Sequence, residues 1–201
     1  MTDQTRVLSI NGSYRDDGIT DQAVTAVTLA LTESGVHVDT VNLRDEDIRF
    51  CLNCRACTQQ PGEQPGLCVL NDSMRGIIDK IEQADAYILA APTNFGSATA
   101  VFKRFMERLI VYGFWPWGAP SPVFRKAESI TKKALLVTSC AAPGILGRLT
   151  YSTSKQLKMT AKLIGAKPVG LLYTGLIAGD PKTRVSARTM QKAANLAQRL
   201  H

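Results

Sequence analysis

The chain has 201 residues, 45% of them apolar and 20% charged, with 15 Gly and 9 Pro, which is typical of a globular domain that buries a core without disulfides. It has no stretch near the ~18 apolar residues that a membrane span needs, and no basic block followed by an apolar block at its N-terminus. We therefore expect a cytoplasmic protein with no membrane partner, whose five cysteines are thiols or ligands rather than disulfides.

The net charge of +7 is unevenly distributed. Residues 1–102 hold 7 Lys and Arg against 14 Asp and Glu, whereas residues 103–201 hold 17 against 3. A basic half can indicate a nucleic-acid-binding α/β domain, but no basic run here alternates with aromatic residues. We favour halves that complement each other within one fold or an oligomer, with a positive excess that attracts an anionic phosphate cofactor, and we expect no nucleic-acid partner.

Apolar periodicity predicts alternating strands and helices along the whole chain. In chain order these are a strand at 7–10, a helix at 20–34, a strand at 36–43, a helix at 72–84, a strand at 85–91, a helix at 98–112, a strand at 133–139, a helix at 146–164, a strand at 168–175 and a helix from 180 to the C-terminus. Gly35 is typical of a helix C-cap, and Asp180-Pro181 is typical of a helix start. Residues 44–70 are irregular and carry four cysteines, and residues 113–131 are predicted to form a loop.

The five predicted strands are apolar almost throughout, which indicates that both faces of each are buried. Such strands form a parallel sheet covered by helices on both sides. The sequence shows no internal repeat and no linker. We therefore predict one doubly wound α/β domain over residues 1–201, whose ligands bind beyond the C-terminal ends of the strands.

The first predicted strand runs into the sequence INGSYRDDGIT, whose residues suit a phosphate. Ser13 and Thr20 would add hydroxyl donors, and Arg15 a permanently charged fork, to the positive end of the following helix. Gly12 and Gly18 permit tight backbone near an anion. The spacing matches neither G-x-x-x-x-G-K-[ST] nor G-x-G-x-x-G, which disfavours ATP and Rossmann-type NAD binding. The alternative is a plain strand–helix turn with Thr20 as the N-cap.

Two further strand ends have similar chemistry. The third strand is followed by PTNFGS, which offers backbone amides, a side-chain amide and an aromatic ring, a composition that suits a planar heterocycle. The alternative there is a generic β–α loop with Ser97 as the N-cap. The fourth strand is followed by TSCAAPGILG. Three small, permissive loops at one edge of the sheet favour a ligand that carries both a phosphate and a planar ring.

Four stretches of the chain resemble the flavodoxin-fold, NAD(P)H-dependent FMN reductases, near their iron–sulfur flavoprotein branch. They are INGSYRDDGIT, CLNCRACTQQPGEQPGLCVLND, ADAYILAAPTNFGSATAVFKRFMERL and the loop after LLVTS, which together span most of residues 5–145. The resemblance implies a flavodoxin-like five-stranded sheet in the order 2-1-3-4-5, and FMN as the cofactor.

The resemblance also implies the residues that contact the cofactor. The first loop would hold the FMN phosphate through Ser13, Arg15, Gly18 and Thr20, with Ile19 where the family usually has Asn. The isoalloxazine ring would be lined by Pro92, Thr93, Asn94, Phe95, Gly96 and Ser97, and ring stacking is expected from Phe95, because the family often has Tyr or Trp where Asn94 stands. The other side of the ring would be closed by the segment from Ser139 to Gly144, with Ser139, Cys140 and Gly144 as the contacting residues.

The cysteines of the irregular segment have a ligand-like spacing. Cys51, Cys54 and Cys57 form C-x2-C-x2-C, and Cys68 follows after ten residues. Four thiolates suit a [4Fe–4S] cluster and also zinc. The final gap is longer than in the cluster-binding relatives, and many similar reductases keep such cysteines without a cluster. Free thiols are therefore the favoured hypothesis, with metal ligation by these four residues as the alternative.

The resemblance implies that NAD(P)H transfers a hydride to bound FMN, which passes electrons to a flavin, a quinone or another small acceptor, so that no side chain is catalytic. The chain has only His37 and His201, which disfavours His-based hydrolysis. A homo-oligomer, dimer or tetramer, is expected, with Trp115 and Trp117 either capping the flavin at a subunit boundary or packing their own loop. The alternative function is an FMN electron-transfer module, with or without a [4Fe–4S] cluster, that does not turn over nicotinamide.

Overall fold

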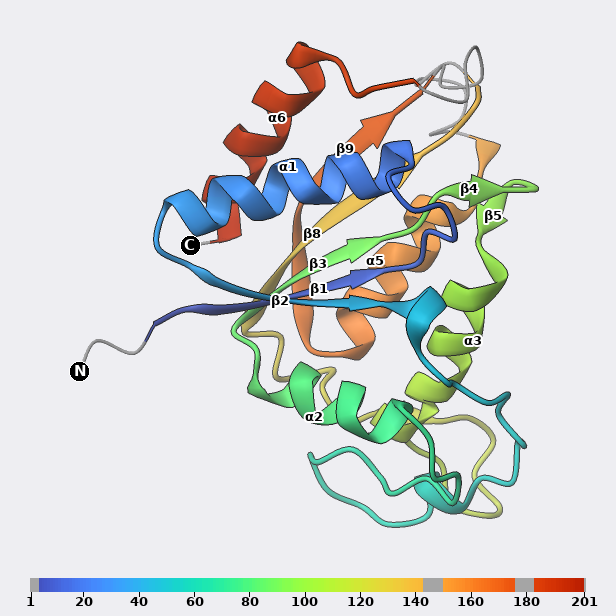
Figure 1. Cartoon of the computed structure of the whole chain (residues 1–201). Helices are drawn as coiled ribbons and strands as arrows, with labels where there is room; N and C mark the ends of the chain where they lie inside the picture. Colours follow the sequence, from blue (N-terminus) through green and yellow to red (C-terminus); the bar gives the residue numbers. More distant parts are fainter. Residues whose placement is uncertain (1–3, 143–149, 176–182, 201) are drawn as a thin grey trace.

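The structure, a computed structural model, describes residues 4–142, 150–175 and 183–200. Among these residues, a parallel five-stranded sheet has the strand order β2-β1-β3-β8-β9 (Figure 1). Its strands are β1 (Arg6–Asn11), β2 (His37–Asn42), β3 (Ala86–Ala90), β8 (Lys132–Ser139) and β9 (Ala166–Thr174). Because β8 and β9 are the fourth and fifth strands of this sheet along the chain, the predicted order 2-1-3-4-5 is confirmed.

Helices cover both faces of the sheet, as predicted (Figure 1). On one face lie α1 (Ile19–Glu33) and α6 (Ala187–Ala197), and on the other lie α2 (Met74–Gln83), α3 (Ala100–Arg108) and α5 (Thr153–Leu163). Short 3-10 turns occur at η1 (Leu43–Asp45), η2 (Ala56–Thr58), η3 (Leu109–Tyr112) and η4 (Gln198–Leu200). No helix in the described ranges is both long enough and apolar enough to cross a membrane.

The strands are apolar because the sheet is buried on both sides. Along β3, Tyr87 and Leu89 belong to the core beneath α2, α3 and α5, whereas Ile88 belongs to the core beneath α1 and α6. All three side chains are 0% exposed. Successive side chains of a strand point to opposite faces, so a strand covered on both sides must be apolar at nearly every position.

The segment between β3 and β8 is more ordered than predicted. The predicted loop 113–131 contains a short antiparallel pair, β6 (Gly113–Phe114) with β7 (Val123–Phe124). The predicted helix at 98–112 begins only at Ala100, because residues 93–98 form a hairpin of β4 (Thr93–Asn94) and β5 (Ser97–Ala98). Its N-cap is Thr99, whose hydroxyl accepts from the Phe102 N–H, and not Ser97.

Two predicted helices fall partly on residues that the structure leaves undescribed. Of the predicted helix 146–164, α5 covers Thr153–Leu163, and residues 143–149 lie outside the described ranges. Asp180-Pro181 also lies outside them. The described last helix, α6, is capped instead by Ser186, whose side chain accepts from the Thr189 N–H.

Gly12 lies where the chain leaves β1 and passes against α3. A Cβ atom at this position would lie 2.9 Å from Cβ of Phe102 and 3.2 Å from the carbonyl oxygen of Ala90. The Gly12 N–H donates to that same oxygen at 2.7 Å, and its carbonyl accepts from Thr99 Oγ1 at 2.7 Å. The loop after β1 is therefore fixed to the end of β3 and to the start of α3.

We predict that Gly12→Ala lowers the free energy of unfolding by about 1–3 kcal/mol, because the added methyl group overpacks the contact with Phe102. The matched control is Gly76→Ala in α2, where a Cβ would meet nothing within 4 Å. That change should raise the free energy of unfolding by about 0.5–1 kcal/mol, because Ala loses less backbone entropy in a helix. Urea unfolding of both variants measures the difference, and a Gly12→Ala variant as stable as the parent would contradict the close approach.

Candidate functional site

A cleft of about 280 Å³ lies at the carboxyl ends of β1, β3 and β8. The loops that follow these three strands form its walls, which is where a doubly wound sheet binds its ligands. Most of the predicted cofactor residues line it: Ser13, Arg15, Gly18, Ile19, Thr20, Pro92, Thr93, Asn94, Ser139 and Cys140. The fold thus brings residues from three distant parts of the sequence to one place.

The tip of the β4–β5 hairpin does not line this cleft. Phe95 and Gly96 form its turn with φ angles of 49° and 74°, values of a type I′ turn that Phe adopts only with strain. The Phe95 side chain is fully exposed, at 109% of its reference area, and the Ser97 hydroxyl pairs with Gln156 of α5 instead. Stacking of Phe95 on a ring stays a prediction, and Gly144 lies outside the described residues.

The hairpin is held firmly against α5. The Gln156 side-chain oxygen accepts from the Ala98 N–H at 2.9 Å, and the Ser152 N–H donates to the Gly96 carbonyl at 2.8 Å. Thr93, which lines the cleft, bonds through its hydroxyl to that of Thr153 at 2.9 Å. The wall formed by residues 92–94 is therefore fixed by contacts to the helix behind it.

The N-terminus of α1 borders the cleft. Its N-cap is Gly18, so no capping side chain accepts from the N–H groups of the first turn. Thr20 is not the N-cap: it lies inside the helix, and its hydroxyl bonds with that of Ser139 at the end of β8 at 2.7 Å. Uncapped N–H groups and the positive end of the helix dipole together favour a bound anion.

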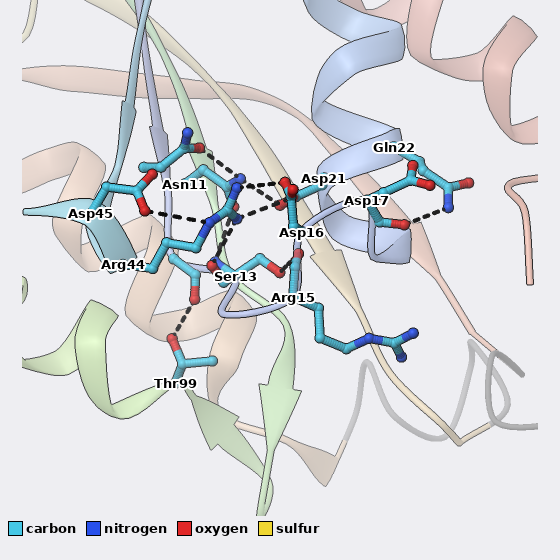
Figure 2. A network of polar contacts seen from close by, with 12 residues as sticks. Asn11, Ser13, Arg15, Asp16, Asp17, Asp21, Gln22, Arg44, Asp45 and Thr99 are labelled. Atoms are coloured by element: carbon cyan, nitrogen blue, oxygen red, sulfur yellow. Dashed lines mark hydrogen bonds and ion pairs between the residues drawn. The ribbon is translucent and has the colours of Figure 1, made fainter. Parts of the chain in front are cut away.

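Arg44, which follows β2, supports the loop after β1 from behind (Figure 2). Its guanidinium donates to the Ser13 carbonyl at 3.2 Å, to Asp21 at 2.9 Å and to Asp16 at 3.0 Å. The Arg44 and Asp21 side chains are only 16% and 12% exposed. One partly buried cation thus fixes the loop backbone and offsets part of the negative charge of two carboxylates beside the cleft.

Asn11, the last residue of β1, completes this network (Figure 2). Its side-chain oxygen accepts from the Ser13 N–H at 3.0 Å, while its amide group donates to Asp21 at 2.6 Å and to Asn42 at 3.3 Å. Sequence reasoning missed Asn11 and Arg44. A usable signal was present, because the two neighbouring strands both end in Asn, and Asn11 and Asn42 are register partners.

The C-terminal part of the chain also contributes to the cleft, which the sequence had indicated only in outline. The lining residues that were not predicted are Tyr14, Thr99 and Thr183, whereas Ala141 lies within the predicted segment from Ser139 to Gly144. The segment before α6 is tied to α1 by Gln22, whose side chain donates to the Thr183 carbonyl and accepts from the Val185 N–H. Arg184 pairs with Asp17 at 2.5 Å.

The four cysteines of the irregular segment meet at a second, smaller pocket of about 50 Å³. The pocket is lined by Cys51, Cys54, Cys57 and Cys68. Burial raises the pKa of Cys57 to about 11, and the other three thiols add to that shift. Asn53, between Cys51 and Cys54, has a positive φ angle of 52°, and Arg55, which follows Cys54, has one of 59°. The Asn53 N–H donates to the Cys51 sulfur at 3.4 Å. Backbone strain of this kind is often kept where it serves a site.

Gly66 explains how Cys68 reaches the other cysteines across the ten-residue spacer. A Cβ at Gly66 would lie 1.8 Å from the carbonyl oxygen of Cys57, so no other residue fits without moving the backbone. The Gly66 N–H also donates to the Val111 carbonyl at 2.8 Å. The chain therefore passes directly against Cys57 two residues before Cys68, and the long spacer does not prevent the four thiols from gathering.

A buried ion pair, Asp72 with Arg108, lies beside this pocket. The two side chains are 0% and 1% exposed, and Arg108 itself lines the pocket. Burial alone would raise the pKa of Asp72, but hydrogen bonds from Arg108, from the Arg49 N–H and from the Met74 N–H outweigh it and lower that pKa overall. The carboxylate is therefore ionised, and its partner remains a cation.

The two tryptophans pack against the cysteine segment and do not line the first cleft. The Arg55 guanidinium lies 3.8 Å from the ring centre of Trp115 and 4.4 Å from that of Trp117, distances typical of cation–π contacts. Arg55 also donates to the Trp115 carbonyl at 2.7 Å. These contacts support the packing alternative for the tryptophans.

The donor set of the cysteine pocket, four thiols, is of the kind that an iron–sulfur cluster requires. No group of three His, Cys, Asp or Glu residues within the described ranges is arranged around one metal ion, as zinc would require. A [4Fe–4S] cluster spreads its four thiolates over four irons and does not need them to converge. Buried Nε atoms of Arg55 and Arg108, which line the same pocket, have no partner among the described residues, which suits an anionic group.

Comparison with known proteins finds a family model, related sequences and solved structures that are similar to this chain. A family model described as NADPH-dependent FMN reductase matches residues 5–170. An iron–sulfur flavoprotein from Methanocaldococcus jannaschii is 31% identical over 103 residues, 51% of each protein, so the match spans about half the length of this relative. An iron–sulfur flavoprotein from Archaeoglobus fulgidus is 27% identical over 195 residues, 97% of this chain and 91% of the relative. The solved structure of an azoreductase from Bacillus anthracis has a TM-score of 0.70 at 15% identity and covers 96% of this chain and 99% of its own, a likeness in fold.

We predict that Arg44→Met lowers the free energy of unfolding by about 1.5–3 kcal/mol, the usual contribution of hydrogen bonds to charged groups, because Asp21 then loses its cation. Amide hydrogen exchange in residues 12–18 should accelerate as well. The control is Arg6→Met, which breaks an exposed pair with Asp39 (47% and 37% exposed) and should change stability by less than about 1 kcal/mol. Equal effects of the two substitutions would contradict the role given to Arg44.

Proposed function

The chain belongs to the family of NADPH-dependent FMN reductases, and we propose that it is an FMN-dependent oxidoreductase that passes electrons from NAD(P)H to a small acceptor such as a flavin or a quinone. The observation that carries this proposal is the cleft at the ends of β1, β3 and β8, with the uncapped N-terminus of α1 at its edge. A flavin nucleotide bound there would have its phosphate at that helix end and its ring between the loops that follow β3 and β8.

The phosphate group of FMN would bind to the loop after β1, through Ser13, Arg15, Gly18, Ile19 and Thr20. Three aspartates in or beside this loop would by themselves repel a phosphate. Asp16 and Asp21 are paired with Arg44, and Asp17 is paired with Arg184. The Arg15 side chain extends away from the Arg44 network (Figure 2) and lines the cleft, which is where a contact to the phosphate would require it.

The ring system would lie between Pro92, Thr93 and Asn94 on one side and Ser139 and Cys140 on the other. Bound FMN supplies the hydride and electron chemistry. The chain supplies fixed walls, since residues 93–98 are held by α5 and Ser139 is held by Thr20. The role proposed for the chain is to bind and orient the cofactor and its substrates.

We predict that Arg15→Ala weakens FMN binding about 10- to 100-fold, because a charge-assisted contact to phosphate contributes about 1.5–3 kcal/mol. Quenching of flavin fluorescence on titration measures the affinity. Arg15→Lys keeps the charge but not the planar fork and should show a smaller loss. Riboflavin, which lacks the phosphate, should bind the parent and Arg15→Ala equally, and unchanged FMN affinity in Arg15→Ala would refute the phosphate assignment.

The proposed reaction is tested by steady-state oxidation of NADH and of NADPH by the purified protein loaded with FMN. With a quinone or free flavin as acceptor, absorbance at 340 nm should fall only when FMN is present. Protein stripped of FMN serves as the control. If neither nucleotide is consumed with any acceptor, reductase activity is rejected and the electron-transfer function is favoured instead.

The second candidate function is an electron-transfer module with FMN and a [4Fe–4S] cluster. Its specific support is the gathering of four thiols at one pocket, and the two relatives described above are iron–sulfur flavoproteins by name. The pocket and the cleft also lie at the two ends of α3: Thr99 lines the cleft, and Arg108 lines the cysteine pocket. A helix of nine residues spans roughly 14 Å.

Iron and sulfide analysis of protein purified without oxygen tests this candidate. About four irons and four sulfides per chain, with absorbance near 400 nm beyond that of the flavin, would support a cluster. Cys57→Ser should then lower the bound iron, whereas Cys140→Ser, outside the pocket, should not. Iron-free protein with full reductase turnover would reject the cluster-containing module and leave the reductase as the remaining candidate.

We also propose that the protein is a homo-oligomer, a dimer or a tetramer. Support comes from large apolar side chains that are 61–74% exposed in the cysteine segment: Phe50, Leu52, Leu67 and Val69. Exposed apolar groups gathered in one segment often mark an interface.

A further inference from the structure

The cysteine pocket has an uneven distribution of charge. Its ionisable lining residues are the four cysteines and two arginines, Arg55 and Arg108, with no carboxylate and no His among the described lining residues. Both arginines have a buried Nε atom that lacks a partner within the described part of the chain. Buried donors without acceptors are costly, and both arginines line the pocket that holds the four sulfurs. An anionic occupant of the pocket would therefore be stabilised by two adjacent guanidinium charges.

Arg108 is the more buried of the two and is fixed from several directions. It donates to the two oxygens of Asp72 at 2.5 and 3.1 Å and to the carbonyl of Arg49 at 2.8 Å. Its Nη2 atom also lies 3.5 Å from the Cys68 sulfur. The same guanidinium therefore contacts a carboxylate and a sulfur of the pocket.

The arrangement forms an oriented dipole. Arg108 lines the pocket, whereas Asp72 does not. The positive end of the ion pair therefore faces the sulfurs, and the negative end lies behind Arg108, away from the pocket. Both side chains are almost wholly removed from water, and charges in such surroundings are screened little. The pair must therefore act on any charge that is placed among the cysteines.

We propose that the Asp72–Arg108 pair sets the reduction potential of a [4Fe–4S] cluster held by Cys51, Cys54, Cys57 and Cys68, with Arg108 raising the potential and Asp72 lowering it. This inference rests on the second candidate function. One-electron reduction, by reduced FMN in the protein or by dithionite in a titration, adds one negative charge to the cluster and its thiolates. A nearby cation and a hydrogen bond to a ligand sulfur stabilise that added charge, and a nearby carboxylate opposes it.

A merely structural role of the pair makes a different prediction. Arg108 links Arg49, Cys68 and Asp72 to α3, so its loss could loosen the cysteine loop without any electrostatic effect. Loosening would change the cluster in the same way whichever partner is replaced. The electrostatic role requires instead that the two charges act in opposite directions, and this difference separates the two explanations.

The test is a redox titration, followed by electron paramagnetic resonance, of FMN-loaded protein whose cluster has been reconstituted without oxygen from iron and sulfide. The variants are Asp72→Asn, Arg108→Lys and the double variant Asp72→Asn with Arg108→Gln. The double variant keeps a hydrogen-bonded neutral pair and so avoids leaving the Asp72 carboxylate buried without its cation. Glu33→Gln, an exposed position at the end of α1 on the opposite face of the sheet, controls for a change in net charge, and the FMN potential in the same samples is the internal reference.

We expect Asp72→Asn to shift the cluster potential upward, the double variant to shift it downward, and Arg108→Lys to lie between the parent and the double variant. Glu33→Gln should leave the potential unchanged. Shifts of Asp72→Asn and the double variant in the same direction, or intact clusters with the parent's potential in both, would overturn the inference and leave the cluster in place. A parent protein that takes up no iron would overturn the cluster function itself, and the inference with it, before any variant is measured.

Discussion

The close approach of α3 to the loop after β1 is the contact on which the cleft depends. Gly12 lies so near Phe102 that a Cβ would not fit, and its two backbone groups bond to Ala90 and to Thr99. These bonds join the end of β1, the end of β3 and the first turn of α3 into one unit. The N-terminus of α1 can therefore face a fixed wall, because the loop that leads into α1 is anchored at its first residue.

Two arginines, one partly and one wholly buried, compensate carboxylate charge beside the two pockets. Arg44 pairs with Asp16 and Asp21 around the loop after β1, and Arg108 pairs with Asp72 beside the cysteine pocket. In both cases the guanidinium also bonds to a backbone carbonyl, of Ser13 or of Arg49. Each arginine thus fixes a loop and places a positive charge beside a proposed site, that of a flavin phosphate in one case and that of an iron–sulfur cluster in the other.

The hairpin after β3 could not be predicted from the local sequence. The segment PTNFGS was expected to line the ring as a unit, but pairing of Asn94 with Ser97 folds it into a tight turn. Its first half lines the cleft, and its tip, Phe95, points into solvent. The turn is set by contacts of Ala98 and Gly96 with α5, which are remote in sequence. The two tryptophans likewise pack on Arg55 through contacts that their own loop does not specify.

The sequence by itself determined the five buried strands, the helices between them and the position of the cleft at the strand ends, because each follows from local periodicity and from the chemistry of residues next to a strand. It also determined which loops supply most of the cleft lining, including Ser13, Arg15 and Thr20. Only the tertiary structure decided that Arg44 supports that loop, that Gly66 brings Cys68 to Cys57, and that Arg108 faces the cysteines. Those contacts join positions tens of residues apart, and their partners are selected by packing rather than by any pattern along the chain.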